Sequence, residues 1–218
     1  MKDRLHWHTV TPLLQLTLIE LMKEPLFKPF RLVGGTSLSL QKGHRKSEDI
    51  DLFTEKPYGS LNFDSIDKWL RKNYTYVSHL LPGPIGMGLS YLIGNTPRDA
   101  VKLDMFYTDE FIRPAFVKEH IRFANIEDII AMKIDIIQRK ARKKDFWDIH
   151  ALLDEYTVKQ MIALHKEKYP YAHDEKLIIQ NFTNFLQAND DLDPICLLQK
   201  HWEVIRYEIA EAVAQSFG

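Results

Sequence analysis

The 218-residue sequence has a single cysteine, Cys196, which excludes an internal disulfide and a zinc site built on cysteine ligands. It also lacks an apolar run of the roughly 18–20 residues that a membrane-spanning helix needs. The opening MKDRLHWHTV contains no apolar stretch of the kind found in signal peptides. We therefore expect a protein of the reducing cytoplasm without a membrane partner.

The sequence has no strong charge of either sign, since 29 basic and 30 acidic residues leave a net charge of −1. With 45% apolar residues, this balance excludes a disordered polyelectrolyte. The 9 glycines and 10 prolines follow no period, which excludes a collagen-like chain. Any polyanionic partner would have to be held by local basic patches, because the overall charge gives no attraction.

Hydrophobic periodicity divides the sequence into two halves. Residues 1–124 are predicted to form a mixed β-sheet core flanked by helices, an α/β (α+β) fold, and residues 125–218 a helical region docked on it. The predicted strands cover 30–35, 48–54, 74–81, 86–93 and 100–107, and the predicted helices 11–23, 36–43, 63–74, 126–138, 146–156, 157–168, 174–188 and 197–216.

Two acidic residues flank Ile50 in a predicted strand, so Asp49 and Asp51 point to the same face of the sheet. Two ionised carboxylates this close repel each other unless a cation lies between them, and Mg²⁺ prefers such oxygen ligands. Asp104, in the later strand VKLDMF, could complete a metal site. The alternative is a solvent-facing strand whose aspartates pair with lysine or arginine.

A glycine-containing turn, Gly34-Gly35-Thr36-Ser37, lies between a predicted strand and a predicted helix. Free N–H groups at a helix N-terminus favour an anion, and glycine lets a phosphate approach the main chain. The alternative is a tight turn in which Thr36 caps the helix. The segment is neither a Walker A loop nor a GxGxxG dinucleotide fingerprint.

The segment GGTSLSLQKGHRKSEDIDLF (34–53) resembles the first motif of the nucleotidyltransferase superfamily, which has a DNA polymerase β-like fold. More narrowly, it is similar to that of the AbiEii/AbiGii toxins of bacterial abortive-infection and toxin–antitoxin systems. A second motif of that family matches Lys102-Leu103-Asp104. A third matches Lys133, Arg139, Arg142, Lys144, Asp145, Phe146, Asp148 and Ile149.

The resemblance implies an enzyme that moves a nucleoside monophosphate from an NTP to an acceptor hydroxyl. RNA such as tRNA would be the acceptor and an antitoxin protein the partner. The roles it implies are metal binding (Mg²⁺ or Mn²⁺) and catalysis by Asp49, Asp51 and Asp104; nucleotide binding by Gly34, Gly35, Thr36, Ser37, Arg45, Lys102 and Lys133; and support by Asp145 and Asp148.

The third motif can also be analysed without the family. Lys133 falls in the middle of the apolar face of its predicted helix, and Asp145 lies on the apolar face of the next. A lysine in such a position needs a partner, so a structural Lys133–Asp145 ion pair is one interpretation and phosphate binding by Lys133 is another, and the two are compatible. The basic run RKARKK (139–144) is either a solvated surface or a contact for an RNA backbone.

Other functions remain open at this stage. The chain could be an inactive nucleotidyltransferase-fold binding module that acts through a protein partner, or it could modify a protein or a small molecule. A haloacid-dehalogenase phosphatase is disfavoured because Phe53 occupies the position where its DxDx[T/V] motif needs threonine or valine. A glycosyltransferase DxD would leave the upstream GGTS turn unexplained.

Overall fold

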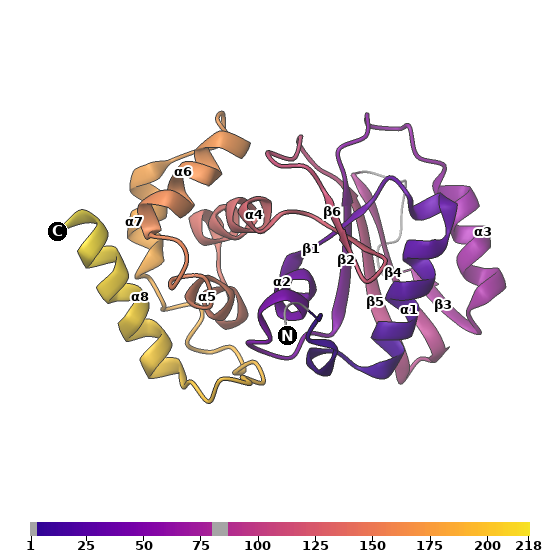
Figure 1. Ribbon diagram of the computed structural model, residues 1–218, viewed down its shortest axis with the longest axis horizontal. Coiled ribbons are helices and arrows are strands. Elements are labelled where there is room, and N and C mark those ends of the chain that lie inside the picture. Colours follow the sequence, from indigo (N-terminus) through magenta and orange to yellow (C-terminus); the bar gives the residue numbers. More distant parts are fainter. Residues whose placement is uncertain (1–3, 80–86) are drawn as a thin grey trace.

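The computed structural model describes residues 4–79 and 87–218, which form a mixed β-sheet and a helical half beside it (Figure 1). The strands are β1 (Arg31–Val33), β2 (Asp49–Thr54), β3 (Tyr76–His79), β4 (Gly88–Thr96), β5 (Asp99–Tyr107), β6 (Phe116–Lys118) and β7 (Ile121–Phe123). The helices are α1 (Pro12–Lys23), α2 (Gly34–Lys42), α3 (Phe63–Asn73), α4 (Ile126–Arg139), α5 (Lys143–His150), α6 (Val158–Lys168), α7 (Glu175–Phe182) and α8 (Trp202–Phe217), with short 3₁₀ turns at Trp7–Thr9 and Pro25–Phe27.

The described strands form one seven-stranded sheet in the order β3-β4-β5-β2-β1-β7-β6. Strands β2 and β5 are parallel, as are β1 and β7, and the other neighbours are antiparallel. The predicted mixed sheet with helices is therefore confirmed. After β7 ends at Phe123, the described chain forms helices and turns, apart from one isolated bridge.

The two faces of the sheet have different neighbours. Helices α1 and α3 cover one face, whereas α2 and the helical half lie on the other (Figure 1). Ile50, Leu52 and Leu103 are fully buried in the core beneath α1 and α3. A second core joins α4 to α8, and a small third cluster around Val33 and Ile129 lies apart from both. The alternate residues of β2 therefore face the helical half.

Helix starts follow the capping chemistry at two of the predicted positions. Thr11 accepts a hydrogen bond from the Leu14 N–H with Pro12 at the first helical position, and Asn125 caps α4 by accepting from the Glu127 N–H. The predicted helices over 11–23 and 126–138 are confirmed. No helix among the described residues is long and apolar enough to cross a membrane.

Several predicted boundaries are wrong in the helical half. The predicted helix over 146–156 ends at His150 and continues as turns, and the one over 174–188 ends at Phe182, ahead of a segment rich in turn-forming asparagine and aspartate. The helix predicted from 197 begins at Trp202. Gln199 has a left-handed φ of 56°, which an α-helix cannot accommodate.

In the sheet, the predicted break at 94–97 begins too early, because β4 continues to Thr96 and the chain turns at 97–98. Gly94 lies against the backbone of β5, where a Cβ would come within 2.2 Å of the Asp99 carbonyl, so this glycine permits a close approach. The β6–β7 hairpin was not predicted, because its turn residues Glu119 and His120 adopt left-handed φ values of 47° and 69° without the usual glycine or asparagine. The predicted break over 82–86 lies outside the described residues.

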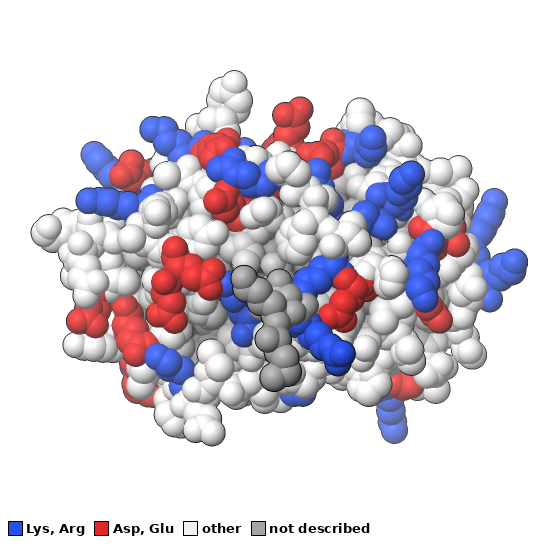
Figure 2. All heavy atoms as spheres, in the orientation of Figure 1, with Lys and Arg blue, Asp and Glu red and all other residues white. Residues whose placement is uncertain are grey.

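The surface agrees with the small net charge. Figure 2 shows basic and acidic side chains intermingled over one face of the molecule, across both halves. A macromolecular partner on this face would therefore meet local charges of both signs rather than one broad field.

Candidate active site

The predicted carboxylates come together on the sheet face that meets the helical half. Burial alternates along β2, so Asp49 and Asp51 are partly exposed on one face while Ile50 and Leu52 are buried on the other. In the parallel register of β2 and β5, Asp51 is the direct partner of Asp104, and Asp49 is the partner of Lys102. Two strands therefore place three carboxylates and one ammonium group side by side.

Helix α2 begins directly against these carboxylates. Gly34 has a φ of 69°, and a Cβ there would lie 2.2 Å from Asp51 Oδ2. A Cβ at Gly35 would lie 2.2 Å from Arg45 Nη2. No side chain caps this helix at Val33, so the N–H groups of its first turn are left free of a side-chain acceptor. This geometry suits an anion held beside the carboxylates.

Thr36 and Ser37 lie beneath this turn rather than at its surface. The predicted cap at Thr36 is wrong, because α2 already begins at Gly34. The buried Thr36 hydroxyl donates to the backbone carbonyl of Asp49 and lies 2.8 Å from Ser47 Oγ. The hydroxyls of Thr36 and Ser37 are both buried. Thr36 thus fixes the start of β2 relative to α2, and phosphate binding by these two side chains stays a prediction.

A buried aspartate, Asp148, gathers three basic side chains under the site. Arg45 donates to it in a bidentate pair, with Nε–Oδ1 and Nη2–Oδ2 distances of 2.7 and 2.9 Å. His44 Nε2 is 2.7 Å from Oδ1 and Lys133 Nζ is 2.5 Å from Oδ2. Burial alone would raise the pKa of Asp148, but the Lys133 and Arg45 charges and hydrogen bonds lower it well below its usual range. The resemblance implies nucleotide binding by Arg45, and in the structure its ion-pair partner is Asp148.

The expected interhelix ion pair is present. Lys133 Nζ on α4 donates to Asp145 Oδ1 on α5 at 2.8 Å, and both side chains are buried. The second Asp145 oxygen accepts from the Arg142 backbone N–H at 3.0 Å, which secures the first turn of α5. Lys133 therefore pairs with both Asp145 and Asp148. Because Arg45 shares Asp148, this network joins α4, α5 and the loop that carries Arg45.

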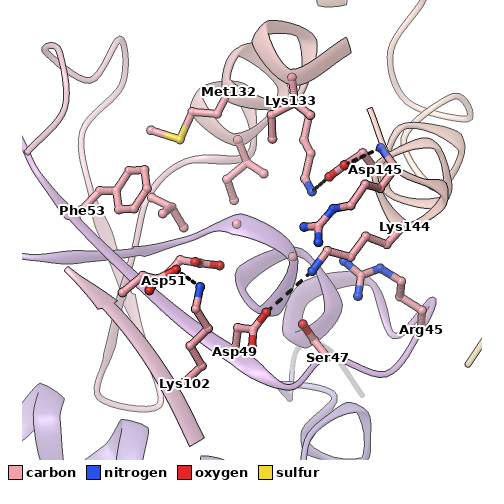
Figure 3. Close-up of a pocket in the computed structure, with 17 residues that line it drawn as sticks. Arg45, Ser47, Asp49, Asp51, Phe53, Lys102, Met132, Lys133, Lys144 and Asp145 are labelled. Carbon is pink, nitrogen blue, oxygen red and sulfur yellow. Dashed lines mark hydrogen bonds and ion pairs between the residues drawn. The ribbon is translucent and has the colours of Figure 1, made fainter. Parts of the chain in front are cut away.

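These groups surround a cavity of about 200 Å³ between the sheet and the helical half (Figure 3). Thr36, Ser37 and Asp148 are the predicted site residues that do not line it. The lining consists of Val33, Gly34, Gly35, Arg45, Ser47, Asp49, Asp51, Phe53, Lys102, Asp104, Ile129, Met132, Lys133, Ile136, Arg142, Lys144 and Asp145.

Two lysines neutralise part of the carboxylate charge. Lys102 Nζ donates to Asp104, and Lys144 Nζ on α5 lies 3.6 Å from Asp49 Oδ2. Burial, reinforced by the charges of Asp104 and Asp49, nevertheless raises the pKa of Asp51 to about 6. The two lysines thus pair with Asp104 and Asp49 and leave Asp51 without a direct ion pair to either of them.

The donor set suits a hard divalent cation, because it consists of carboxylate oxygens that lack full neutralisation. Across residues 4–79 and 87–218, no three acidic, histidine or cysteine side chains are already placed to hold a metal ion. Metal binding would therefore require small side-chain movements, with Lys102 and Lys144 released from Asp104 and Asp49.

Sequence reasoning missed several lining residues. Phe53 shares the exposed face of β2 with Asp49 and Asp51, so the same period-two pattern could have identified it. Lys144 and Arg142 lie in the basic run 139–144, for which the sequence allowed either a solvated surface or a contact with an RNA backbone. Met132 precedes Lys133 on α4, and no local signal distinguishes it from a core residue.

A segment near the C-terminus also reaches the site. The Lys46 N–H donates to the Ile195 carbonyl and the Leu197 N–H to the His44 carbonyl, both at 2.9 Å. This connection, between residues 44–46 and 195–197, borders a second cavity of about 290 Å³. The two cavities share Arg45, Ser47, Asp49 and Lys144.

The sequence matches the family described as nucleotidyl transferase AbiEii toxin of type IV toxin–antitoxin systems over residues 17–213. The chain belongs to the AbiEii family. An uncharacterized protein of Aquifex aeolicus (strain VF5), aq_aa25, is 29% identical over 187 residues, which cover 81% of this chain and 82% of that protein.

Two solved structures share the AbiEii chain's fold. A candidate nucleotidyltransferase from H. pylori superposes with a TM-score of 0.60 at 20% identity, covering 93% of each chain. The nucleotidyltransferase toxin MenT4 of Mycobacterium tuberculosis has a TM-score of 0.58 at 13% identity, covering 93% of this chain and 83% of that one. The expected nucleotidyltransferase fold and family are therefore confirmed.

Proposed function

We propose that this AbiEii-family chain is a metal-dependent nucleotidyltransferase that transfers a nucleoside monophosphate from an NTP to a hydroxyl of an RNA such as tRNA. The observation that carries the proposal is the register that sets Asp51 beside Asp104, with Asp49 on the same face and the first turn of α2 against them. Phosphoryl-transfer sites need this combination of oxygen ligands and N–H donors.

Asp49, Asp51 and Asp104 would hold Mg²⁺ or Mn²⁺. A divalent ion bound there would act as a Lewis acid that offsets the negative charge developing in the reaction. The N–H groups at Gly34 and Gly35 bind the terminal phosphates, and Lys102 and Lys144 face them once released from their carboxylates. Asp104 accepts the proton of the attacking hydroxyl. The oxygen of the acceptor hydroxyl then bonds to the α-phosphorus, while the bond from the α-phosphorus to the β-phosphate oxygen breaks and pyrophosphate leaves.

Support for an RNA acceptor comes from the basic run at the cavity. Lys143 and Lys144 point inward and pair with Asp193 and Asp49, whereas Lys140 and Arg142 are exposed, and Arg142 also lines the cavity. Exposed cations at the rim suit an RNA backbone. The family further suggests a toxin with a cognate antitoxin protein as its partner.

The test is a labelling assay with each α-³²P-NTP, Mg²⁺ and total bacterial tRNA. We expect label on RNA with the wild type, none with Asp49→Ala/Asp51→Ala, and full label with Asp64→Ala, an exposed acid on α3. Label on protein alone would replace RNA with a protein acceptor. The absence of label with every NTP would favour a binding module that acts through a protein partner.

A further inference from the structure

The cavity has a charged end and an apolar end. Asp49, Asp51 and Phe53 follow one another along one face of β2, about 7 Å apart by strand geometry. In Figure 3, Lys133, Lys144 and Arg45 lie toward the right of the cavity, whereas Phe53 and Met132 lie at its left end. The triphosphate proposed above belongs with the cations. The apolar end is left without an assigned ligand.

Phe53 is held as a fixed aromatic surface. Its direct partner on β5 is Phe106, and the two rings meet edge to face with centroids 6.0 Å apart. From the helical half, Ile129 and Met132 belong to the same small apolar cluster, which is separate from both main cores. Phe53 is only partly buried and lines the cavity. Aromatic rings in such positions stack on nucleobases.

We propose that Phe53 and Met132 form the nucleobase site of the NTP, in which the base is held by stacking and apolar contact alone. This inference rests on the nucleotidyl-transfer function proposed above. Among the lining residues that the structure describes, Ser47 is the one neutral side chain able to hydrogen-bond, and it lies beyond Asp49, away from Phe53 (Figure 3). No lining amide or hydroxyl therefore stands beside Phe53 to bond the edge of the base.

A consequence for substrate choice follows from this chemistry. Sites that hydrogen-bond a substrate can reject an analogue that lacks the group by about 10⁴-fold or more, whereas apolar pockets discriminate by roughly 10- to 200-fold. The four NTPs should therefore differ by no more than about 200-fold in kcat/KM. The larger purine rings are expected to bind better than the pyrimidines because they stack over more area.

The test measures equilibrium binding of the four α,β-methylene NTP analogues with Mg²⁺, by calorimetry, to the full chain. Phe53→Leu keeps an apolar side chain but removes the ring, and Phe53→Tyr restores it. Phe116→Leu is the matched control, because this partly buried ring stacks on Phe123 and does not line the cavity. Inorganic tripolyphosphate is the probe that has no base.

We expect Phe53→Leu to weaken all four analogues about tenfold and to leave tripolyphosphate binding unchanged, while Phe53→Tyr and Phe116→Leu bind like the wild type. Unchanged analogue affinity in Phe53→Leu would overturn the inference, as would a wild-type preference above about 200-fold for one base. A rise in the KM for tRNA without a change in analogue binding would assign this end to the acceptor instead. Failure of the labelling assay alone would overturn only the proposed transfer reaction, because the binding measurement does not depend on it.

Discussion

Gly34 and Asp51 are packed so closely that a Cβ on the glycine would lie 2.2 Å from a carboxylate oxygen. The first residue of α2 thus fixes where this carboxylate can lie. The contact links the phosphate-binding turn and the metal-binding strand of the proposed site, and it makes the missing side chain of Gly34 a requirement of the site's geometry.

We predict that Gly34→Ala abolishes nucleotidyl transfer by displacing Asp51. Gly59 provides a matched control, because its φ of 78° imposes the same left-handed strain while a Cβ there meets nothing within 4 Å. Both variants should lose about 1–2 kcal/mol of stability in urea unfolding from backbone strain. Only Gly34→Ala should lose label transfer and Mn²⁺ binding; full activity in that variant would contradict the packing argument.

The raised pKa of Asp51 predicts a pH-dependent stability. Because its folded pKa of about 6 exceeds the ordinary value of 3.8, the folded state binds the proton more tightly than the unfolded state. This carboxyl therefore destabilises the metal-free protein progressively as the pH rises from about 4 to 6. Asp51→Asn should raise the unfolding free energy at pH 7, by at most about 3 kcal/mol, while abolishing activity.

At pH 4 the same variant should match the wild type in stability. Mg²⁺ should raise the melting temperature of the wild type at pH 7 and have little effect at pH 5. An Asp51→Asn protein that is less stable than the wild type at pH 7 would show that this carboxylate is already neutralised by Lys102 and Lys133.

Removing the Asp148 carboxylate should lower the stability of the protein, whereas removing that of Asp51 should raise it. The change Asp148→Ala leaves Arg45 and Lys133 buried without this acceptor, which should cost about 3–5 kcal/mol of stability. Glu155→Ala, which removes a surface pair with Lys42, should cost less than about 1 kcal/mol in the same urea titration. Equal losses in both variants would argue that the buried network contributes no more than a surface pair.

Because the folded pKa of Asp148 lies well below that of an ordinary carboxyl, its ionised form stabilises the protein above about pH 4. That stabilisation is lost as the pH falls through the folded pKa. The stability of Asp148→Asn should therefore depend less on pH below 4 than that of the wild type.

Lys144 is predicted to affect substrate binding more than stability. Its ion pair with Asp49 is partly exposed, so Lys144→Met should change the unfolding free energy by less than about 1 kcal/mol. The loss of a cation at the cavity should raise the KM for NTP about tenfold. Lys140→Met, in the same basic run but not lining the cavity, is the control. Equal KM values for the two variants would exclude a phosphate contact by Lys144.

The parts of the fold that depend on local pattern could be predicted from the sequence. The alternation in β2 and the caps at Thr11 and Asn125 are local signals, and each predicted the observed element. The C-terminal end of α7 and the first residue of α8 could not be predicted in this way. The start of α8 is displaced because residues 195–197 bond to residues 44–46, a contact between segments about 150 residues apart that periodicity does not contain.

The carboxylates of the site could be placed because strand alternation fixes their face, and Lys133 could be paired with Asp145 because both lie on apolar helix faces. The partner of Arg45 required the tertiary structure, since Asp148 reaches it from α5 in the other half. Phe53 matches the first family motif but was given no role in the site, although it shares the face of Asp49 and Asp51.

The backbone pairing of residues 44–46 with 195–197 gives the two halves a second connection besides the chain at 124–125. The buried Arg45–Asp148 pair and the bonds from Lys168 Nζ to the Asp109 and Glu110 carbonyls also cross between the halves. The helical half is therefore held against the sheet by contacts from several parts of the chain. The position of the cavity walls does not depend on the short link at 124–125 alone.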